Sequence, residues 1–214
     1  KSRDLLAACT RDLVDMKFLD VRQMTVGQAK CTVQRVSYTG DLGYEISCDP
    51  MDQRALWNVL WDNGASMGIT PFGMRAMMSL RLDRFFGSWM NEFSPDYTAA
   101  ETGMDRFIKW DKDFIGKAAA HNETPARQLV TFDVDAADAD VTAYEPIFIN
   151  GEVLGFCTSG GFSHHTGKSI AFGLIPKEHA NAGLKVEIEI LGDRRAGTLI
   201  SDPIFDADGT RLRS

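Results

Sequence analysis

The chain has 214 residues, of which 44% are hydrophobic and 25% charged, a composition that is ordinary for one large or two small globular domains. Lys and Arg total 23 against 30 Asp and Glu, which gives a net charge of −7, and no basic stripe suggests a nucleic-acid surface. No apolar run approaches the ~20 residues that cross a bilayer, and no signal peptide opens the chain. We therefore expect a cytoplasmic protein that binds neither nucleic acid nor membranes.

The cysteines and histidines predict no metal site. Four cysteines lie far apart and form no CxxC pair, so we expect free thiols in a reducing compartment rather than a zinc ribbon. His164 and His165 are adjacent, and adjacent residues on a strand point to opposite faces, so the two cannot reach one ion. The cysteines are Cys9, Cys31, Cys48 and Cys157.

The first 84 residues predict a mixture of helices and strands, and the next 31 predict a long ordered loop. Apolar residues recur at helical spacing in three segments, while Val and Thr alternate with polar residues in others. The expected elements are a helix from Ser2 to about Lys17, strands at 18–25 and 30–38 with a turn at Gly27, a strand at 44–48, a helix at 52–63 ended by Gly64, a helix from Thr70-Pro71 to about Arg84, and the loop at 85–115.

After residue 123 the pattern changes to short strands only. Asn150-Gly151 separates two apolar runs, and both residues accept the positive φ of a two-residue hairpin turn. The linker-like run 122–125 precedes the change, so we expect an α+β region at 1–123 and an all-β domain at 124–214, built as a small barrel or sandwich. The six expected strands are 127–134, 146–149, 152–158, 169–175, 185–191 and 196–201.

The segment Tyr38-Thr39-Gly40-Asp41-Leu42-Gly43-Tyr44-Glu45-Ile46 is the most informative stretch. Two glycines flank a tight reversal, and strand alternation places Tyr44 and Glu45 on opposite faces. A carboxylate on a half-buried strand is costly unless it is paired, and a planar ligand with two parallel N–H donors would pair with it bidentately. A second interpretation pairs Glu45 with a nearby arginine such as Arg35.

This segment resembles the Y-T-G-E-x-G-[YFV]-E signature of the glycine-cleavage T-protein family, with Asp41 in place of the usual Glu. The resemblance implies that Tyr38 and Glu45 contact tetrahydrofolate and that Glu45 holds the N–H edge of the pterin. It continues at 73–83, which is similar to the family's A-R-D-S-L-R-L-E helix, and at 112–117, so that it covers essentially the whole chain.

Three further stretches look more like the dimethylglycine and sarcosine dehydrogenase branch of this family than like T-protein itself: 89–101, 155–171 and 203–206. The branch implies an upstream FAD domain that oxidises an N-methyl amine. No dinucleotide-binding fingerprint is present in these 214 residues, so we expect FAD only in that upstream domain.

One position departs from the family helix. The motif's first arginine, which contacts the folate in T-protein, falls on Met77, so this helix lacks that contact. Arg81 matches the second arginine, for which an ion pair at the edge of the core and a ligand role are both open.

Other nominations are looser. Arg211 or Arg213 is placed by analogy to hold the folate tail, with a solvated C-terminus as the alternative. Trp110 is expected either to stack on the pterin or benzoyl ring or to pack in the core. The run Thr158-Ser159-Gly160-Gly161 is expected to be a structural turn, since it opens no phosphate-binding loop.

The function implied by the resemblance is transfer of a one-carbon unit. The partners would be tetrahydrofolate, a donor derived from an N-methyl amine, and the upstream half of the same polypeptide; the product would be 5,10-methylenetetrahydrofolate. Family catalysis depends on an aspartate upstream of the matched segments, so we nominate no catalytic residue and expect the 214 residues alone to be inactive. The alternative is a non-catalytic folate-binding or regulatory module on the same scaffold.

Overall fold

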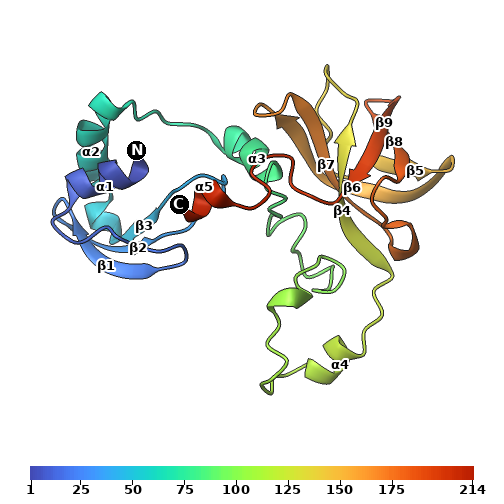
Figure 1. Cartoon of the computed structure of the whole chain (residues 1–214), viewed down its shortest axis with the longest axis horizontal. Helices are drawn as coiled ribbons and strands as arrows, with labels where there is room; N and C mark the ends of the chain where they lie inside the picture. The colour runs from blue at the N-terminus through green and yellow to red at the C-terminus, as the bar shows by residue number, and fades with distance from the viewer. The chain divides into compact units, whose positions relative to one another are not determined.

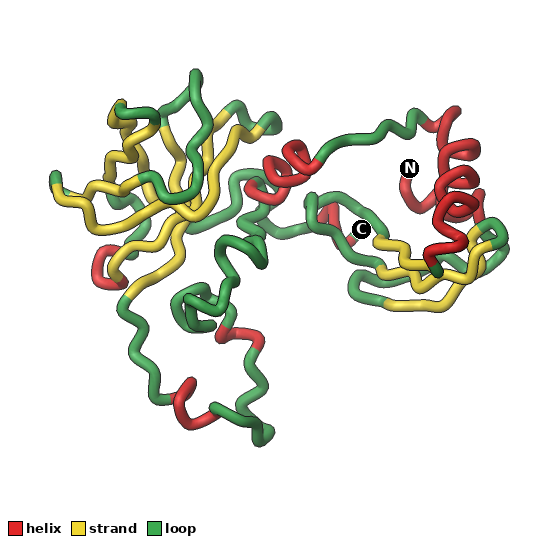
Figure 2. The backbone as a smooth tube through the Cα atoms, turned by 180° about the vertical axis from the view of Figure 1, so that it is seen from behind, coloured by secondary structure: helices red, strands yellow, loops and turns green.

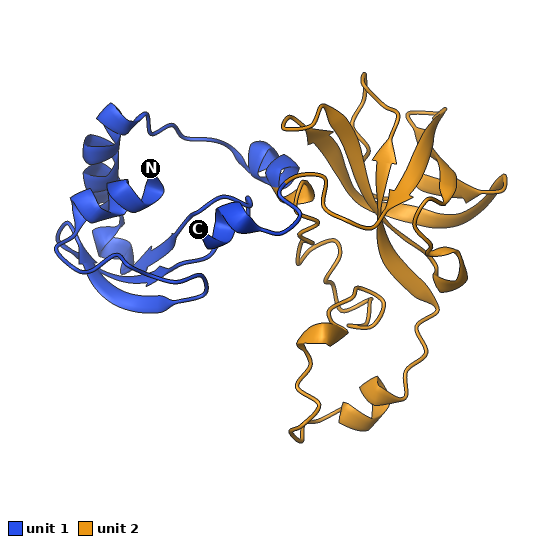
Figure 3. Cartoon of the chain, in the orientation of Figure 1, with its two compact units in different colours: residues 1–80, 206–214 blue, residues 81–205 orange.

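A computed structural model describes all 214 residues and divides them into two compact units (Figure 3). Unit 1 comprises Lys1–Leu80 and Asp206–Ser214, and unit 2 comprises Arg81–Phe205. Helices and an open sheet make up unit 1 and a closed β-barrel dominates unit 2, so the α+β fold class is confirmed. No helix in the chain is both long and apolar enough to span a bilayer.

Unit 1 is built on a three-stranded antiparallel sheet with the order β1-β2-β3 (Figure 1). Residues of β2 alternate between its two faces: Ala29, Cys31 and Val33 are buried against helical residues such as Leu6 and Leu56, and the residues between them face outward. The elements are α1 (Ser2–Cys9), β1 (Val21–Val26), β2 (Ala29–Gln34), β3 (Glu45–Cys48), α2 (Gln53–Gly64), α3 (Met74–Leu82, which extends into unit 2) and α5 (Thr210–Arg213).

Two helix boundaries differ from the prediction, and a third agrees with it. The first helix ends at Cys9 rather than Lys17, because Thr10 takes an extended conformation and pairs with Val26. The second helix, α2, ends at Gly64 as predicted, and a separate 3₁₀ turn at Ala65–Met67 follows it up to Gly68, which adopts the left-handed conformation. The third helix begins at Met74 rather than at Thr70-Pro71.

Unit 2 contains six antiparallel strands that close into a barrel with the order β4-β7-β6-β5-β8-β9. All six predicted strands are confirmed, and the structure decides for a barrel over a sandwich. Phe132, Ile147 and Ile188 are fully buried inside it. The strands are β4 (Arg127–Val134), β5 (Pro146–Ile149), β6 (Glu152–Ser163), β7 (Lys168–Pro176), β8 (Lys185–Ile190) and β9 (Asp193–Ile200).

The predicted hairpin turn between β5 and β6 is confirmed. Asn150 and Gly151 have φ of 53° and 86°, and Ile149 pairs directly with Glu152. A two-residue turn of this kind requires positive φ at both central residues.

We expect Gly151→Val to lower the free energy of unfolding of the barrel by roughly 1 kcal/mol or more, because a β-branched residue resists positive φ. A Cβ at Gly151 would meet no atom within 4 Å, so a loss would report backbone conformation and not a clash. Thermal unfolding measures the effect, and Gly151→Asn is the control, since Asn tolerates this conformation. A melting temperature unchanged by valine would contradict the turn assignment.

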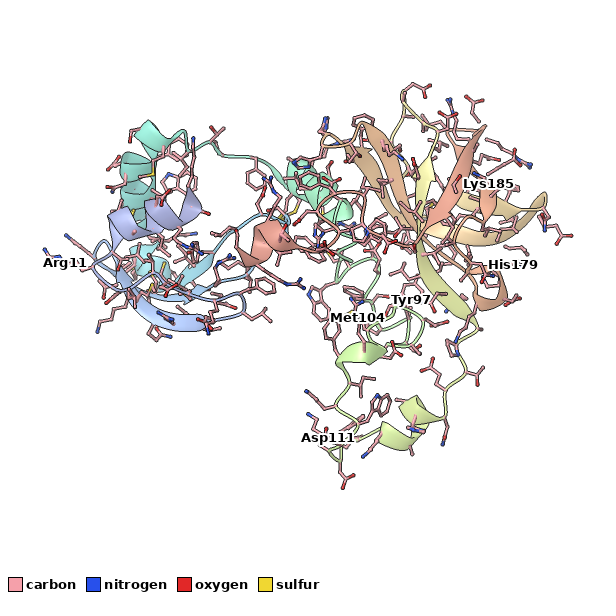
Figure 4. All side chains as sticks on the ribbon, in the orientation of Figure 1. Arg11, Tyr97, Met104, Asp111, His179 and Lys185 are labelled. Atoms are coloured by element: carbon pink, nitrogen blue, oxygen red, sulfur yellow. The ribbon has the colours of Figure 1, made fainter.

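The segment between α3 and β4 is a long loop, as predicted, and it contains two short helical turns (Figure 2). The turns are a 3₁₀ helix at Asp105–Phe107 and α4 at Lys117–His121. Figure 4 shows Tyr97 and Met104 along this loop and Asp111 on its most exposed stretch. The loop carries Trp110, one of the nominated residues.

Candidate functional site

The signature segment forms a loop that leads into β3. Gly40 has a φ of 91° and its amide donates to Ser37 Oγ at 2.9 Å, which closes the first bend of the reversal. Tyr38 is half-buried on this loop. The reversal predicted from the two glycines therefore places Tyr38 and the start of β3 on one continuous stretch of unit 1.

Glu45 is the first residue of β3, and its side chain points away from the core. The neighbouring Tyr44 packs against the buried face of the sheet, as strand alternation predicts. Glu45 itself is exposed rather than half-buried, and it lies opposite Gln34 of β2. Its carboxylate makes no side-chain hydrogen bond or ion pair within the chain, so both oxygens are available to a ligand.

Arg35 does not pair with Glu45, which excludes the second interpretation of that carboxylate. Arg35 is fully buried and donates to the carbonyl of Ser214 at 2.8 Å and to the carbonyl of Gly43 at 3.5 Å. Its guanidinium also lies 5.7 Å from the centre of the Tyr44 ring. Burial lowers the pKa of Arg35. Arg35 therefore ties the signature loop to the C-terminal residues.

Arg211 lies beside the signature segment. Its Nε donates to Asp41 Oδ1 at 2.6 Å, and this hydrogen bond raises the pKa of Arg211. Both side chains are about half exposed, so the pair is open to solvent and contributes little to stability. The structure thus brings three nominated residues, Tyr38, Glu45 and Arg211, into unit 1.

Trp110 belongs to unit 2, where it lines a hollow of about 920 Å³. The indole is partly exposed and stands edge-on to His121, with ring centres 5.5 Å apart. Acidic and basic side chains share the lining: Asp105, Glu123 and Lys177. Trp110 therefore lies at the surface of this hollow and is not part of the core.

Arg81 forms a fully buried ion pair with Glu92, with Nη1 3.0 Å from Oε2. Glu92 also accepts hydrogen bonds from the amide of Ser88 and the hydroxyl of Ser159, while Arg81 donates to the carbonyl of Phe86. Of the two roles left open for Arg81, the structure shows the ion pair, which ties the start of the long loop to strand β6.

A second buried acid, Asp83, pairs with His165. Asp83 Oδ2 lies 2.6 Å from His165 Nδ1, and the imidazole stacks on Phe205 with ring centres 4.1 Å apart. The other oxygen of Asp83 is buried without a partner. Sequence reasoning considered His165 only with its neighbour His164, and it missed a partner 82 positions away because no local pattern connects them.

The run Thr158–Gly161 was expected to form a turn. In the structure it is part of strand β6. A bulge between Cys157 and Ser159 interrupts its pairing with β7. A Cβ at Gly160 would lie 2.5 Å from the carbonyl oxygen of Val141, so the glycine is required where β6 packs against the segment between β4 and β5. The run is structural, although its form differs from the one predicted.

Comparisons with known proteins match nearly the whole chain. Residues 1–112 match the family described as the GCVT N-terminal domain, and residues 127–206 match the glycine cleavage T-protein C-terminal barrel domain. Among individual relatives, mitochondrial dimethylglycine dehydrogenase of Rattus norvegicus is 35% identical over 218 residues, which cover 99% of this chain and 25% of that protein. Aminomethyltransferase of Saccharopolyspora erythraea is 32% identical, covering 96% of this chain and 58% of that protein.

The fold matches a solved structure as well. The crystal structure of the glycine cleavage system aminomethyltransferase T from Bartonella henselae has a TM-score of 0.85 and 25% identity, covering 96% of this chain and 57% of that chain. The chain thus spans a quarter of the dehydrogenase and somewhat more than half of the aminomethyltransferases. The chain belongs to the glycine cleavage T-protein family.

Proposed function

We propose that this chain is a tetrahydrofolate-binding module that transfers a one-carbon unit. In the larger protein, a methylene group derived from an amine would bridge two nitrogens of tetrahydrofolate to give 5,10-methylenetetrahydrofolate. The observation that carries the proposal is Glu45: its carboxylate projects from β3 at the end of the family signature and has no partner inside the chain.

The residues present fit a pterin at this position. A planar heterocycle with two neighbouring N–H donors matches the two oxygens of a carboxylate, which forms stronger hydrogen bonds than a neutral acceptor. Tyr38 lies on the same loop, and Arg211 supplies a positive charge next to Asp41. Arg211 is the group we assign to the acidic tail of the folate.

The organisation that we propose divides the chain near residue 123. Residues 1–123 would belong to the folate-binding domain and residues 124–214 to the barrel domain. This division differs from that of the two compact units, because residues 81–123 group with the barrel and residues 206–214 with unit 1. The two family matches, at 1–112 and 127–206, are separated by residues 113–126, which include the proposed boundary. They support this division.

The likeness to dimethylglycine dehydrogenase supports a finer proposal. The donor would be an N-methyl amine, oxidised by a flavin in another part of the same polypeptide. The identities of 35% to the dehydrogenase and 32% to the aminomethyltransferase are close, so this branch assignment rests mainly on the stretches 89–101 and 155–171.

We expect Glu45→Ala, made in the natural polypeptide that carries these residues, to weaken tetrahydrofolate binding by about 2–4 kcal/mol, or about 30- to 1000-fold in Kd. The loss follows from removing a charged acceptor that would hold two donors. Isothermal titration calorimetry measures it. Glu45→Gln should bind tetrahydrofolate with an affinity between that of the original protein and that of Glu45→Ala, since glutamine keeps one acceptor without the charge.

Glu152→Ala is the matched control, because Glu152 is also an exposed glutamate at the first position of a strand. It should leave the affinity unchanged. Binding by Glu45→Ala within about twofold of the original protein would exclude Glu45 as the pterin-binding residue.

A further inference from the structure

Two cysteines occupy directly opposed positions on neighbouring strands of unit 1. Cys31 of β2 is paired in register with Cys48 of β3, and these strands are adjacent and antiparallel (Figure 1). Directly opposed residues extend their side chains from the same face of a sheet, and both cysteines lie on the face that packs against the core of unit 1.

The hairpin that precedes β3 shows which kind of pair they form. The two-residue turn between β1 and β2 is closed by Val26 and Ala29, the hydrogen-bonded pair at its base. Alternation along the ladder makes Met24 and Cys31 a hydrogen-bonded pair as well. The backbone groups of Cys31 therefore point toward β1, and Cys31 and Cys48 form a non-hydrogen-bonded pair.

Non-hydrogen-bonded pairs are the ones whose side chains come closest. Their Cα atoms are typically about 4.5 Å apart, which lies within the range of about 4.4–6.8 Å that a disulfide spans. Burial raises the pKa of Cys31, and the charge of the neighbouring Cys48 thiolate raises it further, which indicates that the two thiols are close. The backbone is thus arranged for a bond between the two sulfur atoms.

The two thiols differ in accessibility. Cys31 is 1% exposed, whereas Cys48 is only partly buried and lies on β3, an edge strand of the sheet. Both are free thiols in this structure. The remaining cysteines, Cys9 and Cys157, are buried, and neither stands opposite another cysteine in the strand register.

We propose that Cys31 and Cys48 are a redox-sensitive dithiol that a hydroperoxide converts reversibly into a cross-strand disulfide. Cys48 Sγ attacks the peroxide, which gives a sulfenic acid and, with hydrogen peroxide, one water. Cys31 Sγ then attacks the Cys48 sulfur, expels the oxygen as a second water and forms the S–S bond. Two thiols and one hydrogen peroxide thus become one disulfide and two waters, and a dithiol reductant reverses the change.

The bond would fix the register of β3 against β2. Glu45 lies three residues before Cys48 on the same strand, so the cross-link would act on the strand that carries the pterin-binding carboxylate proposed above. The formation of the disulfide does not depend on that function, and its test requires no folate.

The test is peptide mapping of the natural polypeptide after mild treatment with hydrogen peroxide, blocking of free thiols with an alkylating reagent, denaturation and trypsin digestion. Trypsin cuts after Lys30, Arg35 and Arg54, so it separates the two cysteines into peptides 31–35 and 36–54. We expect these two peptides to appear covalently linked, with a mass lower by two hydrogen atoms than their sum. Treatment with dithiothreitol before alkylation should abolish the link.

Two single substitutions test whether Cys48 forms the disulfide. Cys48→Ser should abolish the linked peptides, and Cys157→Ser should leave them unchanged, because Cys157 is buried inside the barrel. The unsubstituted protein decides the question even if a variant fails to fold. The proposal is overturned if peroxide leaves both thiols free, drives Cys48 to sulfinic or sulfonic acid without a link to Cys31, or joins either cysteine to a different one.

Discussion

Replacing Glu92 by Ala is expected to destabilise unit 2 by about 3–5 kcal/mol, because the change leaves the guanidinium of Arg81 buried without a counter-charge. The side chains of both residues are at most 1% exposed, so water cannot take the place of the lost carboxylate. Ser88 and Ser159 lose their acceptor at the same time. For a unit of this size the loss corresponds to a fall in melting temperature of roughly 10–20 °C.

Thermal and urea unfolding of the variant measure this effect, and a surface pair supplies the matched control. Glu187 pairs with Arg194 while both are about half exposed, so Glu187→Ala should change stability by about 1 kcal/mol or less. The double variant Arg81→Met with Glu92→Leu should recover part of the loss, because it removes both buried charges together. Equal melting temperatures for Glu92→Ala and Glu187→Ala would show that the buried pair does not hold the loop on the barrel.

The second large effect concerns catalysis. We expect residues 1–214 alone to form 5,10-methylenetetrahydrofolate no faster than the uncatalysed background, and the natural polypeptide to exceed it. The 214 residues match only 58% of an aminomethyltransferase, and the resemblance to T-protein places the catalytic aspartate in the part that they do not match. Loss of a positioned acid or base costs about 10²–10⁴-fold in rate.

Orientation adds to this deficit. A folate that contacts only part of its binding site is not held in a reactive orientation toward the donor. The rate advantage of positioning the two reactants together is therefore lost. The assay supplies tetrahydrofolate with formaldehyde or an enzymatically generated iminium and follows the methylene product.

Two outcomes would change the conclusion. A rate well above background for residues 1–214, abolished by Glu45→Ala, would place the catalytic machinery within this chain. A natural polypeptide that binds folate through Glu45 and yet shows no turnover would instead support the non-catalytic module.

The sequence by itself determined the local elements whose cause is local. Asn150-Gly151 predicts its hairpin because few residues accept positive φ, and alternation predicts that Tyr44 and Glu45 face opposite sides. The six barrel strands follow from short apolar runs separated by turn residues, and the family follows from motifs whose residues are contiguous.

Only the tertiary structure decided the pairings between distant residues. Arg81 with Glu92, Asp83 with His165, and Arg35 with the carbonyl of Ser214 are joined by folding over separations of 11, 82 and 179 positions. A buried charge takes whichever partner the fold brings within reach, and no periodicity encodes that choice. For the same reason Arg35, one of the two partners considered for Glu45, is buried, and Glu45 is left exposed with both of its oxygens open to a ligand.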